Sequence, residues 1–165
     1  MNTAAMKAVR YHAAKGLRVE ETSIPSANKH QVTIEVKYAG ICGTDLHEYL
    51  HGPMIIPMKE PYPLNGHYDV TTMGHEFSVV VVEVGDNVHS EYNRSEPIGF
   101  IGLTGNGGFA KYVVVEDYMV HKISDTVSFE QGALVERAAL AVQAVKTNGL
   151  QLGMYQDPTV QSFSL

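Results

Sequence analysis

Apolar and polar residues alternate at every step over residues 32–38, which read Val-Thr-Ile-Glu-Val-Lys-Tyr. Successive side chains of a β-strand point to opposite faces, so this pattern is typical of a strand with one buried face. Residues 77–84 differ, because they are aliphatic and β-branched on both faces, as a central strand is. The two patterns together constrain the chain to a fold built around a sheet.

The remaining segments extend a mainly β pattern and add helix near the end. Further strands are predicted at residues 6–11, 17–24 and 109–115, with a short edge strand at 119–123. A short helix is predicted over residues 44–50, stopped by Gly52-Pro53, and a long loop over 54–68. Ser128 and Gln131 fit a capping box, and the helix it begins is expected to reach Thr147. We therefore expect an α+β, mainly β fold with a C-terminal helix.

Composition excludes several classes of function. The chain has 165 residues, of which 44% are hydrophobic, enough for one globular domain with its own core. Its net charge is −6 without any lysine or arginine cluster, which argues against a nucleic-acid partner. No apolar run is long enough to span a bilayer or to act as a secretory signal. The single cysteine fits a reducing compartment, so we expect a cytoplasmic protein with no membrane partner.

Three potential metal ligands stand out. Cys42, the only cysteine, follows the strand predicted at 32–38, and His75 and Glu76 follow later in a Gly-His-Glu-Phe segment. A thiolate, an imidazole and a carboxylate are the ligand types of a catalytic zinc site that keeps its fourth position open. Glu136 is an alternative source of the oxygen ligand. The residue types therefore point to one zinc ion that acts on a substrate.

Two further residues suit proton transfer, and simpler roles remain open for all of them. Thr44 and His47 lie within one helical turn, so they could pass a proton from the metal towards solvent. Thr44 could instead cap the helix, Cys42 could be a small buried apolar residue, and Glu136 could be solvated. Spacing alone does not decide between these roles.

The glycine-rich segment 105–108 has the composition of a phosphate-binding loop. It precedes a predicted strand and does not open a helix, so the dinucleotide-binding mechanism does not apply. We interpret it as a tight turn.

Taken in order, segments 6–11, 40–47, 74–77, 102–115 and 128–136 resemble the GroES-like N-terminal domain of zinc-dependent medium-chain alcohol dehydrogenases. The similarity is strongest to the 2,3-butanediol, sorbitol and threonine dehydrogenase branch. It implies a partly open β-barrel and reversible NAD-linked oxidation of a secondary alcohol.

The same resemblance assigns roles to the candidate residues. It implies that Cys42 and His75 bind the catalytic zinc and that Glu76 is a direct or occasional ligand. Glu136 matches a residue that either ligates the zinc or holds its water, depending on the branch. Thr44 and His47 match the proton relay.

Four departures from the family pattern shape the expected domain. No cysteine occurs over residues 88–99, where the family carries a structural zinc lobe, so we expect that lobe to be deleted. Val79 replaces a glycine, and Arg137 replaces a proline, which predicts a helix that runs on and turns Glu136 away. The resemblance covers residues 6–153, where the family would enter its Rossmann domain. We expect that domain to be absent and residues 154–165 to be an unrelated tail.

The expected function is that of a truncated zinc-dependent oxidoreductase whose ancestral substrate is an alcohol or diol such as 2,3-butanediol. Without a site for the nicotinamide, we expect little activity from this chain alone. A non-enzymatic zinc-binding or interaction module and a non-functional gene remnant are the alternatives. Apolar surface that the second domain covers in the family predicts self-association, including a homo-oligomer.

Overall fold

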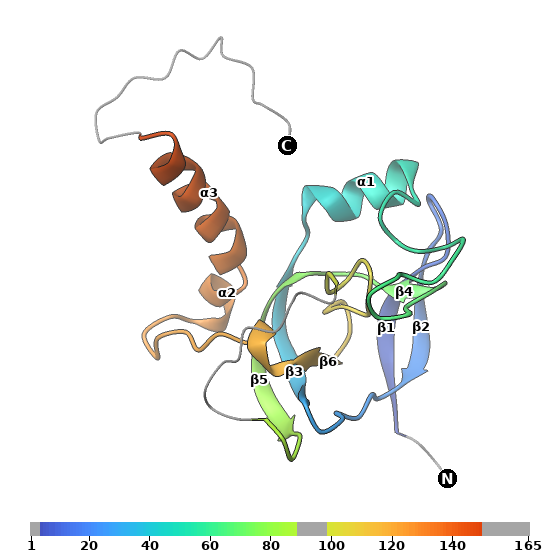
Figure 1. Cartoon of the computed structure of the whole chain (residues 1–165), viewed down its shortest axis with the longest axis horizontal. Coiled ribbons are helices and arrows are strands. Elements are labelled where there is room, and N and C mark those ends of the chain that lie inside the picture. Colours follow the sequence, from blue (N-terminus) through green and yellow to red (C-terminus); the bar gives the residue numbers. More distant parts are fainter. Residues whose placement is uncertain (1–3, 89–98, 150–165) are drawn as a thin grey trace.

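A computed structural model describes residues 4–88 and 99–149, which form two three-stranded sheets. One sheet has the order β2-β1-β4, and the other has the order β5-β3-β6 (Figure 1). All neighbouring strands are antiparallel. The strands are β1 (Ala5–Tyr11), β2 (Leu17–Ser23), β3 (Gln31–Gly40), β4 (Thr71–Thr72), β5 (Glu76–Val84) and β6 (Tyr112–Glu116). The mainly β prediction is confirmed.

The two sheets meet along β1. Its Val9 N–H donates to the carbonyl of Phe109, and Ala8 forms an isolated bridge with Ala110 just before β6. Each sheet covers its own apolar cluster, because the alternating strands turn one face inward. The cluster at the β2-β1-β4 sheet consists of Tyr11, Ile56, Met73 and Leu103. The cluster at the β5-β3-β6 sheet consists of Val32, Ile34, Val113 and Val115. The sheets do not close into a complete barrel, which agrees with the expected partly open one.

The helices lie at the ends of the strands. They are α1 (Gly43–His51), a 3₁₀ turn η1 (Asp117–Met119), α2 (Phe129–Gly132) and α3 (Val135–Thr147). The predicted capping box is present at the start of α2, where Ser128 accepts from the Gln131 N–H and Gln131 accepts from the Ser128 N–H. Figure 1 shows α3 extending away from both sheets, and none of its residues is buried.

Two local predictions are wrong. Residues 119–123 form no strand, because the Val120 N–H closes the η1 turn on Asp117 while Met119 and Val120 pack against the Val32 cluster. The helix predicted to run unbroken to Thr147 is split into α2 and α3. The segment α2 packs closely on β5 at Gly132, where an added Cβ would lie 3.0 Å from Ser78. Apolar residues in these segments reflect packing against the sheet, which local periodicity does not report.

The glycine-rich segment 105–108 is a turn that leads towards β6, as predicted, and not the opening of a helix. Most of the expected deletion at 88–99 and all of the tail at 154–165 lie outside the described residues. No helix within residues 4–88 and 99–149 is long and apolar enough to cross a bilayer.

A buried carboxylate fastens the long loop after α1 to that helix. Glu48 is 1% exposed and accepts the N–H groups of Met54 at 3.0 Å and Ile55 at 2.5 Å. Gly52 makes room for this contact, because a Cβ there would lie 2.5 Å from the Glu48 carboxylate and 2.6 Å from the Tyr11 hydroxyl. The loop is therefore ordered by charge-assisted hydrogen bonds.

Glu48→Ala should destabilise the protein by about 2–3 kcal/mol, because two hydrogen bonds to a charged acceptor are lost. Urea unfolding followed by circular dichroism measures this change. Glu60→Ala makes the same substitution at an exposed position of the same loop and should change stability by less than about 0.5 kcal/mol. Equal midpoints for the two variants would contradict this role of Glu48.

Candidate metal centre

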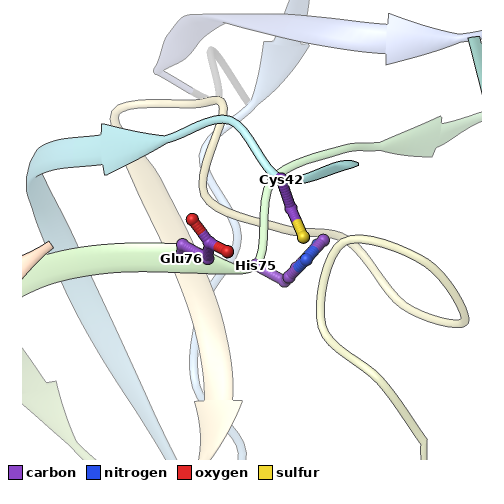
Figure 2. Close-up of side chains that lie close together, drawn as sticks. All are labelled: Cys42, His75 and Glu76. Atoms are coloured by element: carbon purple, nitrogen blue, oxygen red, sulfur yellow. The ribbon is translucent and has the colours of Figure 1, made fainter. Parts of the chain in front are cut away.

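Three potential ligand atoms converge at one end of the β5-β3-β6 sheet. The Cys42 sulfur, a ring nitrogen of His75 and a carboxylate oxygen of Glu76 all lie within 4.8 Å of one another. Figure 2 shows the Cys42 sulfur beside the His75 ring, with the Glu76 carboxylate next to them. The structure thus brings together the three residues that the sequence singled out.

Strand pairing explains this convergence. Gly40, the last residue of β3, is the register partner of Glu76, the first residue of β5. Cys42 follows Gly40 as the N-cap of α1, and His75 directly precedes Glu76. An added Cβ at Gly40 would lie 2.9 Å from the Glu76 carboxylate, so the glycine leaves space for that side chain. Gly74 has φ +94°, which favours glycine and sets the backbone that leads into His75.

Asp45 is a residue of the site that the sequence analysis missed. Its side chain is buried, its Oδ2 accepts the Cys42 N–H at 3.0 Å, and its Oδ1 lies 3.6 Å from Nδ1 of His75. Burial raises the pKa of Asp45, although the Cys42 N–H and the His75 ring oppose that shift. A carboxylate behind one ring nitrogen orients an imidazole and leaves the other nitrogen for a metal. The available signal was the spacing of a capping box, with Asp45 three residues after Cys42.

Glu76 already has a cationic partner. Its Oε2 lies 2.6 Å from Nε of Arg137, while its side chain is only 1% exposed. Burial acts to raise the pKa of Glu76, but hydrogen bonds from Arg137 and Cys42 outweigh it, so the pKa is lowered. Glu76 is therefore held as a carboxylate beside Cys42 and His75.

Glu136 lies near the cluster without joining the three-atom group. Glu136 is an exposed residue on the first turn of α3. Partial desolvation of its carboxyl group and the neighbouring Glu76 carboxylate raise its pKa. The helix runs on through Arg137 as predicted, and Arg137 hydrogen-bonds to Glu76. The expectation that Glu136 is turned away is wrong, because its carboxyl group lies beside that of Glu76 and lines the same groove as His75. Metal ligation by Glu136 stays a prediction.

The two candidate relay residues lie on α1. The Thr44 hydroxyl is 3.8 Å from the Cys42 sulfur, and His47 is exposed to solvent. Thr44 does not cap the helix, because Cys42 occupies the N-cap position, so that alternative is wrong. The geometry places Thr44 at the cluster and His47 at the surface, and the relay role of both stays a prediction.

A groove of about 590 Å³ opens beside the cluster. His75 and Glu136 line it together with apolar side chains of β5 and α3, such as Phe77, Val79 and Leu140. A concave, mostly apolar surface with a few polar groups is typical of small-molecule sites. The cluster therefore borders a space that can admit a small ligand.

Comparison with known proteins agrees with this geometry. Residues 28–125 match the family described as the alcohol dehydrogenase GroES-like domain. The chain belongs to this family. It is 43% identical over 169 residues to the (R,R)-butanediol dehydrogenase of Bacillus subtilis strain 168, an alignment that covers 90% of the chain and 49% of that relative. The chain thus spans about half the length of the curated relatives it matches.

Solved structures show the same fold. The 2R,3R-butanediol dehydrogenase from Bacillus subtilis matches with a TM-score of 0.79 and 44% identity, over 86% of this chain and 47% of that one. A putative zinc-binding dehydrogenase from Sinorhizobium meliloti 1021, bound to NADP, matches with a TM-score of 0.70 and 28% identity. That match covers 87% of this chain and 46% of that protein. The family resemblance inferred from the sequence is confirmed.

Asp45→Asn should weaken zinc binding about 10- to 100-fold, because the carboxylate that lies 3.6 Å from Nδ1 of His75 loses its charge. Competition against a chromophoric chelator measures the dissociation constant. Asp125→Asn makes the same change at an exposed position and should leave zinc affinity unaltered. Equal affinities for the Asp45 and Asp125 variants would show that Asp45 does not orient the ligand.

Proposed function

We propose that this chain is the catalytic domain of a zinc-dependent oxidoreductase that acts on a secondary alcohol or diol such as 2,3-butanediol. The observation that carries the proposal is the convergence of Cys42, His75 and Glu76 in a domain of the alcohol dehydrogenase family. The similarity to butanediol dehydrogenases supports the substrate class.

The side chains present fit zinc in their donor chemistry. Cys42 and His75 would hold the ion, Asp45 would orient His75, and Glu76 or Glu136 would supply an oxygen ligand. Zinc would supply Lewis acidity, which makes a hydroxyl group at its open position easier to deprotonate. The adjoining groove would hold the carbon chain of the alcohol against Phe77 and Leu140.

The chain's own residues would then remove the proton. Thr44 would accept the alcohol proton, a role supported by the position of its hydroxyl 3.8 Å from the Cys42 sulfur. His47, exposed on the same helix, would pass that proton to solvent. The threonine hydroxyl accepts one proton and releases another, so it returns to its starting state.

Oxidation also requires an acceptor for the hydride, which we propose to be NAD. The NADP bound to the Sinorhizobium dehydrogenase supports a nicotinamide cofactor. Within residues 4–88 and 99–149, all pairs of strands are antiparallel, so these residues contain no parallel strand–helix–strand unit of the kind that cradles a pyrophosphate. Among the same residues, the one strand that leads directly into an α-helix, β3 into α1, carries Cys42 at the junction. The described residues would therefore bind the alcohol and zinc, and the nicotinamide would be held by other residues.

Self-association is part of the proposal. Four valines of β5 are more than one third exposed: Val80, Val81, Val82 and Val84. Leu140, Val142 and Val145 of α3 are exposed as well. Apolar surface of this kind favours contact with a second protein surface, which would include another copy of the chain.

A second candidate is a zinc-binding module without catalysis. The observation that favours it is the ion pair of Arg137 with Glu76, since this pair occupies a carboxylate that the catalytic site would use. Zinc binding without NAD-dependent oxidation of a diol would distinguish this function from the first.

The purified protein should bind about one zinc ion per chain, and both Cys42→Ser and His75→Ala should remove most of it. Elemental analysis after dialysis against trace zinc measures the content. His30→Ala alters an exposed histidine away from the cluster and should retain the metal. Unchanged zinc content in Cys42→Ser would refute the proposed site.

A further inference from the structure

We propose that Arg137 competes with the metal, because its guanidinium pairs with the Glu76 carboxylate that would otherwise bind zinc. This inference rests on the proposed zinc site and adds a residue that sets its affinity. Arg137 would withhold one oxygen ligand until it moves away, so the site would bind zinc less tightly than its donor set allows.

Arg137 contacts the segments on both sides of the cluster. Its Nε donates to Oε2 of Glu76 at 2.6 Å, and its Nη2 donates to the carbonyl of Ile41. Ile41 directly precedes Cys42, and Glu76 directly follows His75. The guanidinium is therefore bonded to the backbone next to one ligand and to the side chain next to the other.

The burial of Glu76 makes its charge dependent on a cationic partner. The Glu76 side chain is 1% exposed, and its Oε1 has no hydrogen-bond partner among the described residues. A buried carboxylate with neither a metal nor Arg137 would be an uncompensated charge, which is strongly destabilising. Arg137 thus supplies the countercharge that a metal would supply, and it stabilises the metal-free cluster.

The two cations compete for the same carboxylate. The Cys42, His75 and Glu76 ligand atoms lie within 4.8 Å of one another, so a divalent ion held among them would be repelled by a guanidinium 2.6 Å from the Glu76 carboxylate. Arg137 can yield, because its side chain is 48% exposed and α3 has no buried residues to fix it. Release of Arg137 into solvent would free Glu76, and the energy of the broken pair would be subtracted from the energy of zinc binding.

The test is the zinc dissociation constant measured by chelator competition. Arg137→Gln should bind zinc at least about fivefold more tightly than the unmodified chain, a moderate effect because the arginine is half exposed. Lys146→Gln removes the same charge from the last turn of the same helix and should stay within about twofold. These two variants separate a local ion pair from a general change in net charge.

A double-mutant cycle identifies the partner. In a Glu76→Gln background, Arg137→Gln should change zinc affinity by less than about twofold, because the carboxylate for which the cations compete is gone. A full fivefold gain in that background would show that Arg137 acts through another group and would overturn the inference.

Thermal unfolding in a chelator provides a readout without metal. Arg137→Gln should lower the melting temperature of the metal-free protein, while Lys146→Gln should not. Added zinc should raise the melting temperature of Arg137→Gln more than that of the unmodified chain. If Arg137→Gln does not fold, Arg137→Lys is the second variant. A lysine lacks the forked geometry and should tighten zinc binding by a smaller factor.

The outcomes separate this inference from the proposed function. Equal or weaker zinc binding by Arg137→Gln, with binding still dependent on Cys42, would overturn the role of Arg137 and leave the zinc site intact. Zinc binding that does not depend on Cys42 in either protein would overturn the zinc site and this inference together.

Discussion

The antiparallel pairing of β3 with β5 is the constraint on which the rest of the site depends. Its register places Gly40 opposite Glu76, so the residues just beyond the two strand ends meet in space. Cys42 and His75 are 33 positions apart in the chain, yet this pairing makes them neighbours. A one-residue slip would turn Glu76 to the other face of the sheet and dismantle the cluster.

Buried carboxylates organise the surroundings of this pairing, and each is stabilised in a different way. Glu48 accepts backbone N–H groups and orders a loop, Asp45 accepts the Cys42 N–H and lies 3.6 Å from the His75 ring, and Glu76 pairs with Arg137. Burying a carboxylate is costly unless a hydrogen bond or a cation compensates the charge. The candidate metal centre therefore borders carboxylates whose charge is partly compensated without a metal, and zinc would have to displace part of that compensation.

The sequence predicted features that depend on local period or spacing. The strand at 32–38 and the capping box at Ser128 follow from the few residues that form them, and the family resemblance assembled Cys42, His75 and Glu76. The contact of Arg137 with Glu76 could not be read in this way, because the two residues are 61 positions apart and their distance depends on where α3 docks. The strand predicted at 119–123 was wrong for a related reason. The apolar residues Met119 and Val120 pack on the sheet, and such a tertiary contact cannot be read from local sequence.

X-ray absorption at the zinc edge of the zinc-loaded protein shows directly whether Cys42 binds the metal, because it reports the ligands of the bound ion. We expect one sulfur ligand at about 2.3 Å, from Cys42, and nitrogen or oxygen ligands at about 2.0–2.2 Å. The Cys42→Ser protein should lose the sulfur shell. A zinc ion surrounded only by nitrogen and oxygen in the unmodified chain would contradict this expectation, because Cys42 would then not bind the metal.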